Sequence, residues 1–399
     1  MGQSFQLSQP AIIALIVVSL DAMGLGIIMP ALPALLRELM PAGQIAGHYG
    51  AFLSLYALMQ VIFAPLLGQL SDSYGRRPVL LTSLAAATID YAVMASAPVL
   101  WVLYIGRMVS GITGATGAVA ASIIVDTTQE RLRTRWFGYM GACYGAGMIA
   151  GPALGGIFCN ISIHAPFIAA ALFNGFSFII TTIYLRHSNN AHDKNEKRCN
   201  LKLFPKYQPG NILRKSGLLL IVFFIIQLIG QLPAALWVIY GEDRFQWNTI
   251  TVSLSLTAFG AAHTICQAFL IGPLSAWMGD RKTLILGILA DAGGFILLAF
   301  TMRGWMIFPI IPLLAIGGIS MPLLQAMLSK NINSNEQGAL QGVLTSLTNI
   351  SAIAGPIFFT TLYFVTTRSW NGWVWLIGGA FYIPCILILL KYFNVKETP

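Results

Sequence analysis

Residues 68–78 read Gly-Gln-Leu-Ser-Asp-Ser-Tyr-Gly-Arg-Arg-Pro, and this short polar segment separates two long apolar stretches, 47–70 and 79–97. A helix needs about 20 mostly apolar residues to cross a bilayer, and each flanking stretch has about that length. Residues 68–78 therefore predict a tight polar turn that joins two membrane-spanning helices.

The same alternation of apolar stretches and polar breaks extends over the whole chain. Of its 399 residues, 56% are hydrophobic and 9% are charged, whereas a soluble domain carries roughly 25% charged residues. An ordinary soluble fold is therefore excluded, and we predict an all-α membrane protein. The first apolar stretch lacks the basic leading region of a cleaved signal peptide, so it should remain as the first helix. The twelve predicted spans are 11–35, 47–70, 79–97, 99–125, 136–158, 165–186, 217–240, 249–272, 283–302, 305–329, 338–365 and 371–392.

The net charge of +9 is distributed unevenly along this predicted topology. With the N-terminus inside the cell, Arg107 falls within the membrane and every other Lys and Arg faces the cytoplasm except Arg37, Arg244, Arg303 and Arg368. An excess of Lys and Arg is typical of cytoplasmic loops. We therefore predict that both termini are cytoplasmic and expect no nucleic-acid partner.

A long polar segment, 187–216, leaves six predicted spans on each side. We expect a solvated cytoplasmic linker, with lipid headgroup contact as the alternative. Landmarks recur at a constant offset of 204 residues: Gly68 with Gly272, Gly75 with Gly279, Trp101 with Trp305, and Gly151-Pro152 with Gly355-Pro356. Duplicated halves around a midplane site are typical of the major facilitator fold. We therefore predict two pseudo-symmetric six-helix bundles, residues 1–186 and 217–399.

The 68–78 segment resembles the loop signature of that superfamily, in which small residues allow close helix packing and an Asp and several Arg form a cytoplasmic gating latch. The residues that match are Gly68, Asp72, Gly75, Arg76 and Arg77, with Asp126 as a partner at the end of the fourth span. Ser73 stands where the family usually has Arg. The second copy, 272–281, has Ala276 in place of Asp72, so we expect only the first half to keep the full latch. A plain topology-setting turn is the alternative.

The fifth span contains Gly141, Gly145, Gly147, Gly151-Pro152 and Gly155-Gly156. Spaced glycines let helix backbones approach closely, and a proline bends a helix. The pattern Gly147, Gly151, Pro152 and Gly155 is similar to the antiporter motif of the same superfamily. Close packing of small residues without any transport role is the alternative.

Five charged or titratable residues lie inside apolar spans: Asp21, Asp90, Arg107, His263 and Asp291. A charge at the bilayer centre costs at least about 2.5 to 3.5 kcal/mol on insertion scales, so these residues need a reason to be there. Asp90 and Arg107 lie at similar distances from the turn at Pro98, and should meet in an antiparallel hairpin. His263 and Asp291 should lie at comparable depth, while Asp21 should face a cavity or reach Arg107.

Each of these residues also has a structural interpretation. Arg107 with one Asp can be an ion pair that only stabilises the fold. His263 can be a hydrogen-bonded core histidine.

Polar side chains also share helix faces at i,i+4 spacing. The pairs are Tyr56 with Gln60, Gln227 with Gln231, and His263 with Gln267. We expect these faces to line a binding cavity, in which Tyr56, Gln60, Gln231, His263 and Gln267 contact a substrate. Hydrogen bonding between helices is the alternative for each pair.

Several longer runs are more specific. Residues 20–24 (Leu-Asp-Ala-Met-Gly), 48–50, 55–60, 110–118 and 231–238 resemble the tetracycline/proton antiporters, and the matches extend along nearly the whole chain. The resemblance implies export of tetracycline as a chelate with a divalent cation such as magnesium, in exchange for protons, across the bacterial inner membrane.

The same resemblance assigns residue roles. Asp21, Asp90 and Asp291 would be the essential membrane acids, Arg107 the membrane base, and His263 part of a proton path with Asp291. Gln60 and Gln267 would line the drug site. Because the metal arrives with the substrate, no fixed metal site and no permanently bound cofactor are expected.

Other functions remain open at this point. A multidrug/proton exporter of the same superfamily would share the motifs, and a nutrient symporter would disagree with the antiporter motif. The sequence has no GxxxxGK[ST] nucleotide loop, no HExxH and no nucleophile elbow, so we expect a transporter and not an enzyme. Its five cysteines show neither metal-ligand nor disulfide spacing.

Overall fold

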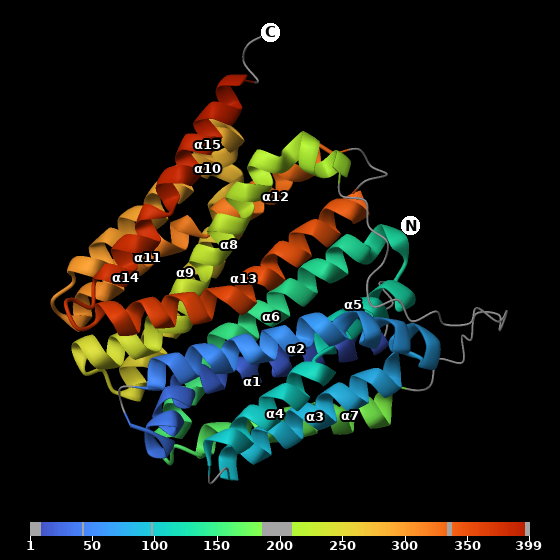
Figure 1. Ribbon diagram of the computed structural model, residues 1–399. Helices are drawn as coiled ribbons and strands as arrows, with labels where there is room; N and C mark the ends of the chain where they lie inside the picture. Colours follow the sequence, from blue (N-terminus) through green and yellow to red (C-terminus); the bar gives the residue numbers. More distant parts are fainter. Residues whose placement is uncertain (1–8, 42–43, 97–98, 186–209, 333–336, 396–399) are drawn as a thin grey trace. The chain divides into compact units, whose positions relative to one another are not determined.

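A computed structural model of the chain describes residues 9–41, 44–96, 99–185, 210–332 and 337–395. Within these ranges the regular structure is helical throughout, and twelve segments are long and apolar enough to cross a membrane. The predicted number of spans and the all-α class are therefore confirmed. Figure 1 follows the chain from the blue α1 to the red α15.

The first six spans are built from seven helices. These are α1 (Gln9–Leu39), α2 (Ile45–Tyr74), α3 (Arg76–Ser96), α4 (Leu100–Thr113), α5 (Thr116–Thr127), α6 (Glu130–Cys159) and α7 (Ala165–Tyr184). The fourth span comprises α4 and α5, which are separated by Gly114 and Ala115.

Two of the second six spans are divided: the tenth into three helical segments and the twelfth into two. The six spans comprise α8 (Gly210–Phe245), α9 (Thr249–Phe269), α10 (Ile271–Phe300), the 3₁₀ turn η2 (Gly304–Met306), α11 (Ile307–Gly317), α12 (Ser320–Lys330), α13 (Gln337–Thr366), α14 (Trp373–Ala380) and α15 (Tyr382–Val395). The tenth span combines η2, α11 and α12.

The predicted eighth and ninth spans end at 272 and begin at 283, and the segment between them is helical. Helix α10 continues through it, and only Gly279 departs from helical geometry, with φ of 81°. Gly75, the residue 204 positions earlier, has φ of 95°, and these two are the positive-φ glycines of the described chain. A left-handed residue without a Cβ turns the backbone sharply at little cost, so one glycine in each half replaces a longer loop.

The fold consists of two compact units. One contains residues 1–40, 55–205 and 249–257, and the other contains residues 41–54, 206–248 and 258–399. In the first unit α1 packs on α5, α6 and α7, and in the second α8 packs on α12, α13 and α15. Most of the predicted linker, 187–216, lies outside the described residues, so the predicted domain limits stay predictions.

Helix α7 shows how the apolar surface is arranged. One face carries small or polar buried residues such as Ala170, Asn174, Ser177 and Thr181, and the other carries exposed apolar side chains: Ile168, Leu172, Phe176, Ile179 and Ile183. A continuous apolar stripe of this kind is unfavourable in water but suits lipid contact. The exposed stripe therefore agrees with a membrane environment.

Candidate functional site

The first buried charge pair joins α3 to α4. Arg107 Nε lies 3.7 Å from Asp90 Oδ2, and both side chains are almost fully buried. The adjacent Gly106 leaves the room that the carboxylate occupies, because a Cβ there would lie 2.5 Å from Asp90 Oδ1. The hairpin spacing predicted this pairing, and the ion pair confirms it.

Aromatic rings complete the surroundings of Arg107. Its Cζ lies 5.6 Å from the ring centre of Tyr56 and 5.7 Å from that of Tyr91. Cations over aromatic faces gain roughly 0.5 to 2 kcal/mol. The guanidinium on α4 therefore contacts one carboxylate and one ring of α3 and one ring of α2, and its Nη2 also lies 3.3 Å from Met94 Sδ.

Asp21 lies in the middle of α1 and lines a cavity of about 370 Å³ within the first unit. Residues of α1, α5 and α6 line the cavity, among them Phe137, Tyr144 and Gly117. Of the two positions that the sequence left open for Asp21, the structure places it at the cavity. One carboxylate beside aromatic rings suits a bulky cationic ligand.

Gln60 and Tyr56 meet the break between α4 and α5. Gln60 Nε2 donates to the carbonyl of Gly114 at 3.0 Å. The Tyr56 hydroxyl lies beside the same glycine, 3.2 Å from where its Cβ would stand. Carbonyls at the end of a helix lack intrahelical partners, so Gln60 satisfies one of them. At this contact Gln60 links two helices, as the alternative interpretation expected.

In the second unit a cluster forms around two adjacent glycines, Gly317 and Gly318, at the junction of α11 and α12. A Cβ on Gly317 would overlap the Asp291 carboxyl group, and one on Gly318 would overlap the His263 ring. Both titratable side chains therefore occupy space that these glycines leave open. Because Gly317 and Gly318 are adjacent in the chain, Asp291 and His263 lie at a similar depth along the helices, as predicted.

Hydrogen bonds connect this cluster further. Gln267 Nε2 donates to the Gly318 carbonyl and lies 3.4 Å from both this oxygen and His263 Nε2. The Tyr382 hydroxyl donates to Asp291 Oδ2, and Tyr382 is almost fully buried. No sequence pattern predicted a role for Tyr382, which is 91 residues away from Asp291. Its only sequence signal is a hydroxyl group in the last apolar span.

The predicted face of Gln227 and Gln231 meets α13. Gln227 Nε2 donates to Thr348 Oγ1 at 2.6 Å, and Gln231 packs over Gly355, where an added Cβ would lie 2.5 Å from the Gln231 Cβ. Gln227 thus forms a hydrogen bond between two helices, which was the alternative to lining a binding cavity. The role of Gln231 in substrate binding stays a prediction.

The latch of the first half centres on Arg76 and Arg77, the first two residues of α3. Arg76 Nε donates to Asp126 Oδ2 at 2.9 Å, and Arg76 Nη1 contacts both Asp72 and Ser71. Arg77 Nη2 donates to the Thr182 carbonyl at 2.8 Å. Arg76 therefore joins the end of α2 to the end of α5, while Arg77 joins α3 to α7.

The glycines of the latch segment differ in their surroundings. Gly75 has the left-handed backbone described above. No described heavy atom lies within 4 Å of where a Cβ on Gly68 would stand. The close packing that the resemblance implies for Gly68 therefore stays a prediction.

The glycines of the antiporter motif face α1. A Cβ on Gly147 would overlap the Ser19 carbonyl, one on Gly151 would lie 2.7 Å from both the Gly26 Cα and the Met23 oxygen, and one on Gly155 would lie 2.5 Å from the Ile27 oxygen. Pro152 follows on the same contact, since its Cδ is 2.9 Å from where a Cβ on Gly26 would stand. The predicted close approach of two helix backbones is therefore present.

We expect Gly151→Ala to destabilise the first unit, because the new methyl group meets backbone atoms that cannot rotate away. Overpacking of this kind costs about 1 to 3 kcal/mol, and thermal unfolding of the purified protein should shift to lower temperature. Gly141→Ala on the same helix is the matched control, because nothing described lies within 4 Å of its added Cβ. Equal melting temperatures for the two variants would contradict this packing.

The titratable residues are divided between the two units. Asp21, Asp90 and Arg107 belong to the first, and His263 and Asp291 to the second. Among the described residues no group of three His, Cys, Asp or Glu side chains is placed to hold a metal ion. A metal that travels with the substrate stays a prediction.

Comparisons with known proteins agree with this architecture. The model of the Major Facilitator Superfamily matches residues 14–260 and 219–399. The class G tetracycline resistance protein of Vibrio anguillarum is 67% identical over 383 residues, covering 96% of this chain and 98% of that protein. The class E tetracycline resistance protein of Escherichia coli is 50% identical over 393 residues, covering 97% and 96% respectively. A solved structure of a POT family transporter in complex with 5-aminolevulinic acid superposes with a TM-score of 0.80 at 13% identity, covering 100% of this chain and 98% of that one.

The chain therefore belongs to the major facilitator superfamily and is a membrane transporter, not an enzyme. Within this superfamily it belongs to the tetracycline resistance proteins, as the resemblance of its longer sequence runs predicted.

Proposed function

We propose that this protein exports tetracycline, as its chelate with a divalent cation such as magnesium, in exchange for protons by alternating access, and so confers tetracycline resistance. One observation carries the proposal: in a chain 67% identical to a tetracycline resistance protein, each of the three membrane carboxylates has different surroundings. Asp90 is paired with a cation, Asp21 faces a cavity, and Asp291 is held by a tyrosine hydroxyl.

Asp291 is the group best suited to carry the proton. It accepts a hydrogen bond from the neutral hydroxyl of Tyr382 and packs against Gly317. A carboxylate away from water is unfavourable in its charged form unless a cation accompanies it. A proton or a cationic substrate satisfies this need equally, which makes the two compete for one group. His263 lies on the neighbouring glycine and provides a second titratable group for the path.

Asp21 is a second carboxylate suited to meet the drug. Its cavity combines one carboxylate with the rings of Phe137 and Tyr144. A planar, polycyclic metal chelate with a positive charge matches such a lining, because rings stack and the carboxylate attracts the cation. Tyr56, Gln60, Gln231 and Gln267 are further proposed contacts.

The energetics favour this exchange. One pH unit across the membrane supplies about 1.4 kcal/mol per proton, and each net charge moved involves about 2.3 kcal/mol per 100 mV. If a monocationic chelate leaves as one proton enters, no net charge crosses the membrane. Export then depends on the pH difference alone.

The proposed location is the bacterial inner membrane, with both termini in the cytoplasm. The distribution of Lys and Arg supports this orientation. In that orientation the latch around Arg76 lies on the cytoplasmic side.

Uptake of radiolabelled tetracycline into everted membrane vesicles tests the proposal. With respiration and magnesium, vesicles that contain the protein should accumulate the drug, whereas vesicles from cells without it should not. Nigericin, which exchanges K⁺ for H⁺ and removes the pH difference, should abolish accumulation, and EDTA should do the same by removing the divalent cation. Accumulation that survives nigericin would exclude exchange driven by the pH difference. Movement of dyes but not tetracycline would instead indicate a broader multidrug exporter.

A further inference from the structure

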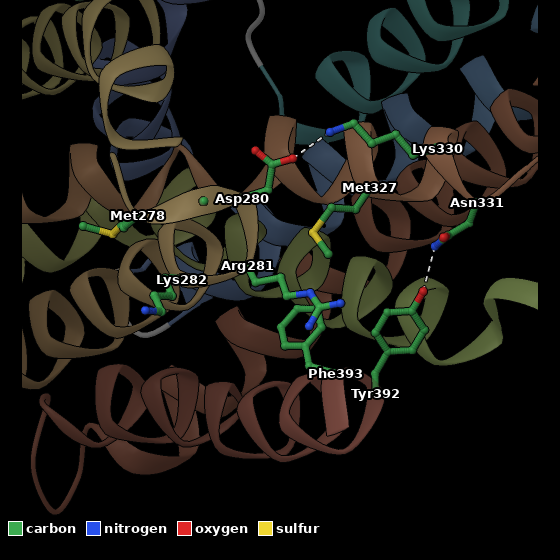
Figure 2. A pocket seen from close by; sticks show the side chains of 10 residues that line it. Met278, Asp280, Arg281, Lys282, Met327, Lys330, Asn331, Tyr392 and Phe393 are labelled. Atoms are coloured by element: carbon green, nitrogen blue, oxygen red, sulfur yellow. Dashed lines mark hydrogen bonds and ion pairs between the residues drawn. The ribbon is translucent and has the colours of Figure 1, made fainter. Parts of the chain in front are cut away.

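A second ion pair lies at the kink in α10, four residues beyond the Ala276 that replaces the latch Asp. Lys330 Nζ lies 2.7 Å from Asp280 Oδ2, and the Ser275 hydroxyl donates to Asp280 Oδ1. Figure 2 shows the Lys330 ammonium directed at the Asp280 carboxylate, at the edge of a pocket of the second unit. The second half therefore lacks the full signature, because Ala276 replaces the Asp, but it has an ion pair of its own.

The offset of 204 residues relates this pair to the latch of the first half. It takes Arg76 to Asp280, Asp126 to Lys330 and Ser71 to Ser275. Both ion pairs span 50 residues, and in both halves the serine bonds to the residue that follows the left-handed glycine. The positions and contacts are the same, and the two charges are exchanged.

The exchange of charges also explains Ala276. In the first half Asp72, four residues before Arg76, is a second partner for the guanidinium. An Asp at position 276 would instead stand four residues before Asp280, and like charges at this spacing repel. Helix polarity fits the exchanged pair as well, because Asp280 directly follows the kink in α10 and Lys330 is in the last turn of α12. A carboxylate at a helix start and a cation at a helix end are each favourable.

Each pair closes a helical hairpin at its open end. In the second unit, α10 and α12 belong to spans joined through residues 301–306, and the pair 280–330 connects the ends remote from that connection. The same hairpin holds Asp291 of α10 against Gly317, at the end of α11. In the first unit the hairpin closed by Arg76 and Asp126 contains the Asp90–Arg107 pair.

We propose that Asp280 and Lys330 form a second latch of inverted charge, which positions the hairpin that carries Asp291. Asp280 and Lys330 are positioning residues, since they lie apart from the Asp291 cluster and act through helix packing. The inference goes beyond the export of tetracycline, and it requires only that Asp291 take part in transport.

Reversing one charge at a time tests this latch. We expect Asp280→Arg and Lys330→Asp each to lower the maximal rate of tetracycline uptake roughly tenfold, a barrier change of about 1.4 kcal/mol, with the KM for the drug little changed. The double variant Asp280→Arg/Lys330→Asp restores opposite charges and should recover at least half of the wild-type rate. Adding Ala276→Asp to the double variant recreates the arrangement of the first half, and should recover the rate further. Ala276→Asp alone should lower it.

Lys282→Asp is the matched control, because Lys282 lines the same pocket without facing Asp280 (Figure 2) and should transport at the wild-type rate. Protein amount and melting temperature are measured for every variant. If a reversed variant does not fold, Asp280→Asn and Lys330→Gln, which remove one charge without creating a like-charge pair, replace it. Wild-type rates in both single variants, or a double variant no better than the poorer single variant, would overturn the proposal. If the wild-type protein itself shows no tetracycline uptake, the result counts against the proposed function and not against the latch.

Discussion

Asp291→Asn is expected to remove gradient-driven accumulation of tetracycline in everted vesicles, with an initial rate lowered on the order of 100-fold or more, as for other lost proton-transfer groups. Asparagine keeps the volume of the side chain and still accepts a hydrogen bond from the Tyr382 hydroxyl. It cannot take up or release a proton in the working range. The packing against Gly317 should therefore persist while the exchange stops.

Asp243→Asn is the matched control for this change. Asp243 also accepts a hydrogen bond from a tyrosine, since Tyr363 Oη lies 3.1 Å from its Oδ2, but it is exposed near the end of α8. The control variant should transport normally. Tyr382→Phe should lower the rate less than Asp291→Asn, because the carboxyl group remains. Wild-type accumulation by Asp291→Asn would contradict the assignment of the proton to this residue.

Arg107→Ala is expected to destabilise the protein by about 3 to 5 kcal/mol, because it leaves the buried Asp90 without its cation. The loss should appear as a lower melting temperature and a smaller amount of folded protein in the membrane. The substitution also removes the contacts of the Arg107 guanidinium with the rings of Tyr56 and Tyr91.

A double variant separates the structural and functional interpretations of this pair. Asp90→Leu/Arg107→Met removes both charges, and apolar replacements of a buried ion pair are often neutral or stabilising. We expect this variant to recover most of the lost stability but not transport, since we propose that the membrane charges take part in exchange. A stable double variant that transports at the wild-type rate would show that the pair is only structural.

The sequence was most informative where geometry is local. Twelve spans followed from the length of apolar stretches, and the Asp90–Arg107 contact followed from counting residues on both sides of one hairpin turn. In both cases the helix rise alone converts residue number into depth. Such arguments need no knowledge of how distant helices pack.

The sequence was least informative where contacts depend on packing between distant helices. The hydroxyl of Tyr382 reaches Asp291 from the last span, and Gly317 and Gly318 are defined by what fills the space beside them. The Asp280–Lys330 pair was missed for another reason. Identical residues at the repeat offset do not reveal a pair whose charges have been exchanged.

Proton movement caused by the drug itself tests the central proposal most directly. Purified protein is reconstituted into liposomes that contain a pH-sensitive dye, with no gradient imposed, and tetracycline with magnesium is added outside. Entry of the chelate should drive protons out, so the internal pH should rise more than in protein-free liposomes and in liposomes with Asp291→Asn. Carrier-dependent entry of tetracycline with no change of internal pH beyond these controls would contradict exchange of drug for protons.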